Sequence, residues 1–98
     1  MEGASVVLRR RGAAEAGAIF VKVDHGNGRA TLYGPAPQSL AADLRPGVER
    51  IFARAHQGDD IESGAAEERL RREIAFDPDL WIIEVENAPS GAWLDGPP

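Results

Sequence analysis

Two acidic residues, Asp77 and Asp79, stand two positions apart beside Trp81 in the segment FDPDLWIIEVEN, residues 76–87. Such a pair could work as an acid and a base, or supply oxygen ligands to a hard cation. The first task needs surroundings that drive the two pKa values apart, and the second needs further oxygen ligands. The apolar neighbours supply neither. We therefore take Asp77, Asp79 and Trp81 as candidate binding residues and expect no catalytic residue and no metal ligand.

The two histidines are the other candidates for catalysis or metal binding. His25 follows Asp24, and His56 lies near Asp59 and Asp60. Neither repeats a spacing such as HxxxH, which would aim two ligands from one face of a helix. We expect both histidines to be exposed loop residues.

Composition removes several classes of function. The 98-residue chain has no cysteine, which excludes disulfides, thiolate catalysis and cysteine-ligated metals. Its net charge of −5 disfavours nucleic acid, because affinity for phosphates comes from cations. No apolar run is long enough to span a membrane, and nothing marks the chain for export. We expect a cytoplasmic protein with no cofactor, no nucleic-acid partner and no membrane contact.

The first half of the chain predicts three strands. Residues 5–10 (SVVLRR) are rich in β-branched side chains, and the basic run at their end reads as a solvated strand end. Residues 18–24 (AIFVKVD) and 29–33 (RATLY) flank Asn27-Gly28, two residues that tolerate positive φ. We therefore expect these two strands to form an antiparallel hairpin.

The second half predicts one helix, Gly64–Phe76, capped by Ser63 or by one residue of the Asp59-Asp60 pair. Its buried stripe repeats every four residues, and its acid-before-base pairs at i,i+4 read as solvated surface. The stripe is Ala66, Leu70 and Ile74, and the pairs are Glu67 with Arg71 and Glu68 with Arg72.

Residues 77–80 are expected to join this helix to a last strand, Leu80–Glu86. The residue before a proline is pushed out of the helical region, so Asp77-Pro78 ends the helix. Asp79 can accept hydrogen bonds from the amides that follow it in an Asx-turn, which would give it a structural use. In the strand, Trp81, Ile83 and Val85 share one face.

Three blocks in this order resemble the domain-of-unknown-function family 1491, small proteins of alphaproteobacteria. The blocks are AGAIFVKV (residues 16–23), ATLYGPAP (30–37) and FDPDLWIIEVE (76–86) followed by WLD (93–95). The resemblance implies an intracellular bacterial α+β protein but no activity. It also favours a strand over a helix for Val48–Ala55, whose periodicity alone fits either. Members usually carry a further helical segment upstream of the point that matches Gly3.

We therefore expect one α+β domain over residues 1–98, with a small antiparallel sheet of four or five strands and one helix packed on one face. Residues 88–98 should fray. The other face of the sheet, which bears Trp81, Ile83 and Val85, needs a cover, either a symmetric homodimer contact or the upstream helix.

Two functions stay open. The first is a non-enzymatic protein-interaction or accessory module that binds a second copy or another protein. The second is a small metal- or ligand-binding enzyme that uses Asp77 and Asp79, with His56 brought close by the fold.

Overall fold

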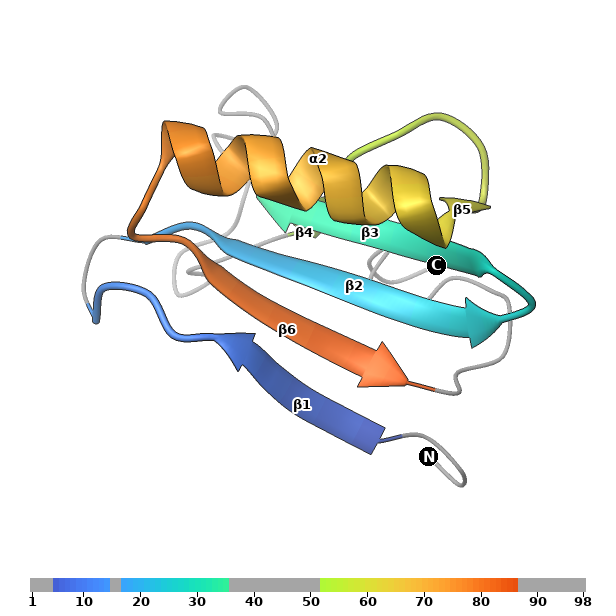
Figure 1. Cartoon of the computed structure of the whole chain (residues 1–98), viewed down its shortest axis with the longest axis horizontal. Coiled ribbons are helices and arrows are strands. Elements are labelled where there is room, and N and C mark those ends of the chain that lie inside the picture. Colours follow the sequence, from blue (N-terminus) through green and yellow to red (C-terminus); the bar gives the residue numbers. More distant parts are fainter. Residues whose placement is uncertain (1–4, 15–16, 36–51, 87–98) are drawn as a thin grey trace, which may run out of the picture.

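A computed structural model describes residues 5–14, 17–35 and 52–86. In these ranges the chain forms six strands and one helix (Figure 1). In chain order they are β1 (Ser5–Arg10), β2 (Ile19–Gly26), β3 (Arg29–Pro35), β4 (Phe52–Arg54), β5 (Ile61–Glu62), α2 (Ser63–Phe76) and β6 (Trp81–Glu86). The α+β class and the single main helix are confirmed.

The strands form one sheet in the order β1-β6-β2-β3-β4, with β5 also paired to β3. The pairs are antiparallel except one, since β6 runs parallel to β2 with Ile19 opposite Trp81 and Val23 opposite Val85. The sheet is therefore mixed rather than antiparallel throughout. The reason is the return path through α2, which brings the chain back across the sheet so that β6 begins at the same end as β2 (Figure 1).

The predicted hairpin is confirmed. β2 and β3 pair antiparallel from Val21–Tyr33 to Gly26–Arg29. Asn27 and Gly28 have φ values of 57° and 72°, the left-handed conformation that a tight two-residue turn requires.

The predicted helix is also confirmed, but its predicted cap is wrong. The N-cap is Glu62, and no side chain caps the first turn. The carboxylates of Asp59 and Asp60 are instead held by Arg54 and Arg29, at 2.9 and 2.7 Å. The Ser63 amide at the start of the helix donates instead to the Gly28 carbonyl at 2.8 Å.

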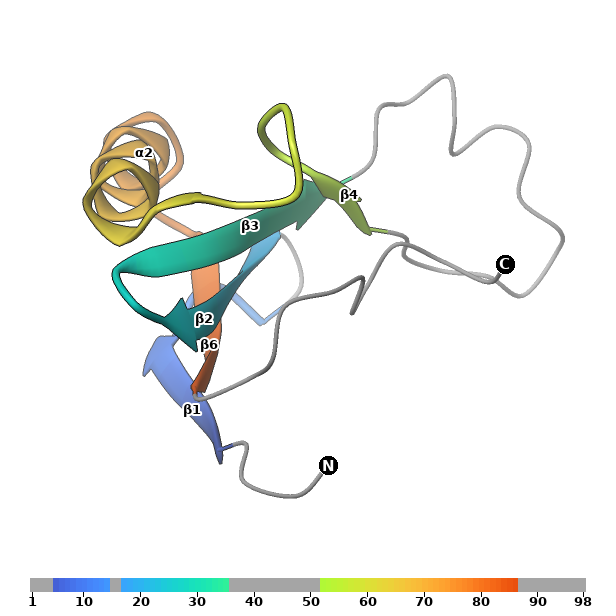
Figure 2. The same ribbon diagram turned by 90° about the vertical axis from the view of Figure 1, so that its right-hand side faces the viewer.

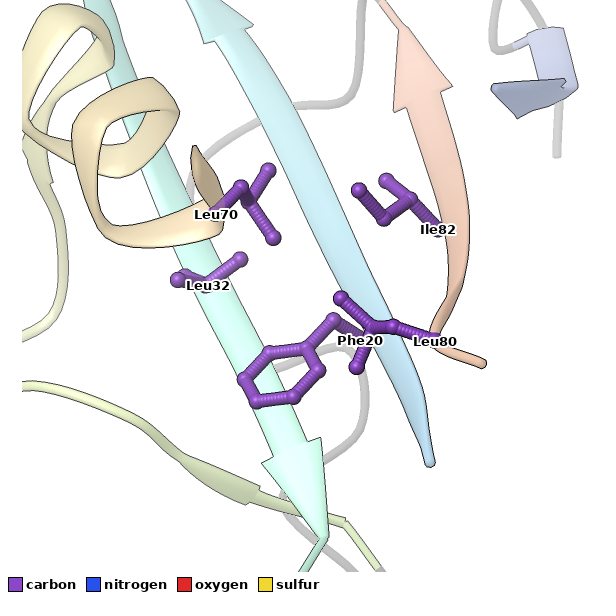
Figure 3. Packing of buried hydrophobic residues seen from close by; sticks show 5 residues of the cluster. All are labelled: Phe20, Leu32, Leu70, Leu80 and Ile82. Carbon is purple, nitrogen blue, oxygen red and sulfur yellow. The ribbon is translucent and has the colours of Figure 1, made fainter. Parts of the chain in front are cut away.

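Buried apolar residues lie on both faces of the sheet. Between α2 and the sheet, Leu70 forms a cluster with Phe20, Leu32, Leu80 and Ile82 (Figure 3). Ala66 of the predicted stripe is also buried, and Ile74 packs at the margin of this cluster. On the opposite face, a second cluster is formed by Val21, Val23 and Tyr33, with Ile19, Phe52, Ile83 and Val85 at its margin.

The second cluster bears on the predicted cover of this face. Val23 and Tyr33 at its centre are buried in the single chain. The cover by a homodimer contact or by an upstream helix stays a prediction. Exposed apolar side chains belong to β1, and this strand lies at the edge of the sheet (Figure 2).

Two other predictions concern residues that lie partly or wholly outside the described ranges. Phe52–Arg54 is a strand, as preferred for Val48–Ala55, whereas residues 48–51 lie outside the described ranges. So do residues 88–98, for which a frayed tail is predicted. Within the described residues, no helix is long and apolar enough to cross a membrane.

Candidate functional site

Asp77 and Asp79 form the turn that joins α2 to β6. The Asp77 carboxylate accepts a hydrogen bond from the Asp79 amide at 3.1 Å, and the Asp77 carbonyl accepts one from the Leu80 amide at 3.2 Å. The Asx-turn is therefore made by Asp77, and its assignment to Asp79 was wrong. The Asp77 amide completes the helix end by donating to the Glu73 carbonyl at 2.8 Å.

Trp81 fastens the same turn to the segment that follows β1. Its indole Nε1 donates to the Ala13 carbonyl at 2.7 Å, and the Ala13 amide donates to the Asp79 carbonyl at 3.0 Å. The Arg11 guanidinium lies 5.9 Å from the centre of the indole ring, within the range of a cation–π contact. The three candidate residues thus lie together, held by bonds that build the joint.

The described residues add no metal-binding group to this joint. Among them, no group of three or more histidine or acidic side chains could hold a metal ion. His56, which we considered as a further member, lies elsewhere, beside β3. The binding role of Asp77, Asp79 and Trp81 stays a prediction.

Both histidines make structural hydrogen bonds and are half-buried, so the expectation of exposed loop histidines was wrong. His56 Nε2 accepts a hydrogen bond from the Leu32 amide at 3.1 Å, and its Nδ1 lies 2.9 Å from the Gln57 carbonyl. Since an amide can only donate, Nε2 is unprotonated and Nδ1 carries the hydrogen. The imidazole thereby continues the pairing along β3 beyond the end of β4. His25 Nε2 lies 2.7 Å from the Thr31 hydroxyl.

A charge cluster that we did not predict from the sequence lies between α2 and the sheet. Glu67 accepts two hydrogen bonds from Arg9, both at 2.7 Å, and one from Lys22 at 2.6 Å. Arg9 also donates to Glu84 at 2.9 Å, and Lys22 and Glu84 are buried. Glu67 therefore faces the sheet rather than pairing with Arg71 in solvent. The predicted Glu68–Arg72 pair is present, at 3.6 Å.

Electrostatics in this cluster favour the charged forms. The hydrogen bonds from Arg9 lower the pKa of Glu67 to about 2, against the opposing effect of partial burial. The same bonds raise the pKa of Arg9. The four side chains come from β1, β2, β6 and α2 and satisfy one another, so the cluster joins the helix to three strands.

The alternation of the strands contained a signal for this cluster. Lys22 is two residues from Phe20, and Glu84 is two residues from Ile82, so both share the face that α2 covers. A charged residue in phase with the core of a strand indicates a buried partner of opposite charge.

Three of the four exposed large apolar residues among the described ones are consecutive in β1. The exposed fractions are 68% for Val6, 41% for Val7 and 51% for Leu8. Val6 and Leu8 pair with Val85 and Ile83 of β6, so these four side chains form one strip on the face opposite α2. We call this strip the β1 patch.

Among the described strands, the two edges of the sheet differ. β4 at one edge has three residues and carries Arg54. β1 at the other edge has six residues and three consecutive apolar side chains, and its charges begin only at Arg9, the extra residue of a bulge. A sheet edge is usually kept from pairing with another chain because its strand is short or carries charges. β1 is longer than β4, and the residues in its middle are uncharged.

Comparison with known proteins gives a family but no activity. DUF1491, described as proteins of unknown function, matches residues 1–95. A protein from A. tumefaciens, solved in solution, shares 40% identity over 97% of this chain and 82% of its own, with a TM-score of 0.70. A DUF1491 protein from Caulobacter crescentus, solved by crystallography, shares 28% identity over 92% of this chain and 73% of its own, with a TM-score of 0.65. No curated protein matches the chain.

Proposed function

Because the chain belongs to DUF1491, a family of unknown function, its relatives transfer no activity, and we propose from its surface that it is a non-enzymatic protein-interaction or accessory module. The observation that carries the proposal is the β1 patch, an apolar strip on an unprotected sheet edge. Apolar patches of this kind on a small domain are the usual sites of protein contacts. The proposal places the module in the cytoplasm of a bacterium. The bacterial sources of the two solved relatives described above support the bacterial part of this proposal.

The described polar groups support a binding role over a chemical one. Arg9, Lys22, Glu67 and Glu84 neutralise one another, and the acidic joint at Asp77 uses its carboxylate to hold its own turn. Within the described ranges, every buried side-chain nitrogen and oxygen has a hydrogen-bond partner. These groups are therefore engaged in building the fold.

The test compares two apolar-to-lysine changes. Leu8→Lys places a charge in the β1 patch, whereas Phe76→Lys changes another exposed apolar residue, 89% exposed at the C-terminal end of α2. Both residues are exposed, so both variants should fold. Immobilised wild-type and variant chains are incubated with a lysate of the source cells, and retained proteins, including copies of the chain itself, are identified by mass spectrometry.

We expect wild type and Phe76→Lys to retain the same partner and Leu8→Lys to lose at least nine-tenths of it, about a tenfold loss of binding. Equal retention by all three chains would overturn the proposal. So would the absence of any retained protein together with a wild-type chain that stays monomeric.

A further inference from the structure

We propose that β1 pairs with β1 of a second copy, antiparallel and across a two-fold axis at Val7, so that two sheets become one. This inference rests on the proposed function and names the partner of the β1 patch. The partner that fits this edge is an extended strand with apolar side chains. β1 of a second copy is such a strand.

Backbone groups provide the first argument. In any strand, alternate residues direct their N–H and C=O groups to opposite sides. β1 pairs with β6 on one side, and on its other side no described residue pairs with it. An extended segment can therefore add to this side without displacing any described contact.

The sequence of β1 provides the second argument, because it is nearly symmetric about Val7. In antiparallel pairing centred there, Val7 faces Val7 of the second copy, and Val6 faces Leu8 of the second copy. Apolar side chains then lie opposite apolar ones, which is the pairing that stabilises neighbouring strands. The β1 patches of both copies join into one continuous strip.

Charge provides the third argument. With the axis at Val7, Arg9 faces Ser5 of the second copy, so arginines do not meet. Arg9 is also already neutralised by Glu67 and Glu84. An axis at Leu8 would instead place Val7 opposite Arg9, which would break the apolar pairing. Val7 is therefore the centre that the sequence favours.

The contact is small, and we expect it to be weak. One strand of six residues offers less surface than the standard interface of a stable complex. The dimer should therefore form in the micromolar to millimolar range, and sedimentation must reach about 1 mM chain to detect it.

Two double variants test the register. V6K/L8K places like charges opposite each other across the axis, whereas V6E/L8K places opposite charges there, and both remove the same apolar side chains. Because Val6 and Leu8 are exposed, both variants should keep the fold, which circular dichroism and thermal unfolding verify. Sedimentation equilibrium gives the mass of each variant against the 10.5 kDa of one chain.

We expect wild type to approach twice the chain mass and V6K/L8K to stay monomeric. V6E/L8K should dimerise with a Kd at least tenfold below the lower limit measured for V6K/L8K, about 1.4 kcal/mol. Equal weakening of both variants would overturn the register. If V6K/L8K does not fold, amide exchange of β1 in the wild-type chain at low and high concentration decides instead.

Two outcomes separate self-pairing of β1 from the proposed interaction module. A wild-type chain that is monomeric at every concentration but captures a different protein through Leu8 would overturn self-pairing alone. A monomeric chain without any Leu8-dependent partner would overturn both.

Discussion

At the scale of single residues, Glu67 joins the helix to two strands of the sheet. One carboxylate binds Arg9 of β1 and Lys22 of β2 while its own backbone belongs to α2. The lowered pKa of Glu67, about 2, reflects these contacts. Loss of the charge should therefore loosen the helix from the sheet.

We predict that Glu67→Gln lowers the free energy of unfolding by about 1–2 kcal/mol near neutral pH, a value reduced for partial exposure. The amide keeps one acceptor but turns an NH₂ group toward Arg9 and Lys22. The matched control is Glu68→Gln, whose pair with Arg72 is exposed at both ends and should matter by less than about 0.5 kcal/mol. Urea denaturation measures both variants.

The pH dependence follows from the depressed pKa of Glu67 in the folded state. The pKa falls from 4.5 to about 2 on folding, so the stabilisation is present above 4.5 and is lost as pH falls from 4.5 through about 2. The difference between wild type and Glu67→Gln should shrink by more than half between about pH 7 and about pH 3. A difference that is the same at both pH values would contradict the assigned charge cluster.

Individual side-chain partners were the part that the sequence predicted least well. The stripe of Ala66 and Leu70 followed from helical spacing, but the side to which Glu67 turns did not. The i,i+4 spacing to Arg71 offers a local partner, whereas Arg9 is 58 positions away in the sequence and becomes a neighbour only through the sheet. Contacts of this range cannot be predicted from spacing alone.

At the scale of elements, the joint between α2 and β6 depends on a close backbone approach. A Cβ atom at Gly17 would collide with the Asp79 carbonyl and the Trp81 ring. Main-chain atoms cannot move aside like the end of a flexible side chain. A glycine is therefore required where the segment before β2 crosses the joint.

Gly17→Ala should destabilise the protein by about 1–3 kcal/mol through overpacking. Gly64→Ala is the control, because no atom lies near that site in the first turn of α2 and alanine favours a helix. The control should be neutral or stabilising by up to about 1 kcal/mol. Thermal unfolding compares the two, and equal stability of both variants would count against the close approach.

Element positions were predicted well because their signals are local. Asn27-Gly28 and Asp77-Pro78 mark turns by backbone preference, which does not depend on distant residues. The cap of α2 was missed because Asp59 and Asp60 pair with Arg54 and Arg29 instead. The orientation of β6 was missed for a related reason, since it depends on the path of the whole connection through α2.

At the scale of the whole molecule, the protein has one face closed by a helix and one edge left apolar. The α+β class could be predicted from the order of elements, and so could the two-sided distribution of apolar residues. The burial of Val23 and Tyr33 within one chain could not be predicted. The composition of a sequence does not determine how much of a sheet face the chain itself covers. Among the described residues, the large apolar side chains that stay exposed on this face are Val6 and Leu8 of β1.

Amide exchange of the wild-type chain, measured across a range of protein concentrations, tests the role of β1 most directly. Pairing with a second copy would place outward N–H groups of β1 in new hydrogen bonds, so their exchange should slow as concentration rises. The amides inside α2, which are already bonded, should not change. Slowing confined to β1 is the result we predict, and exchange rates of β1 that stay constant up to about 1 mM chain would contradict it.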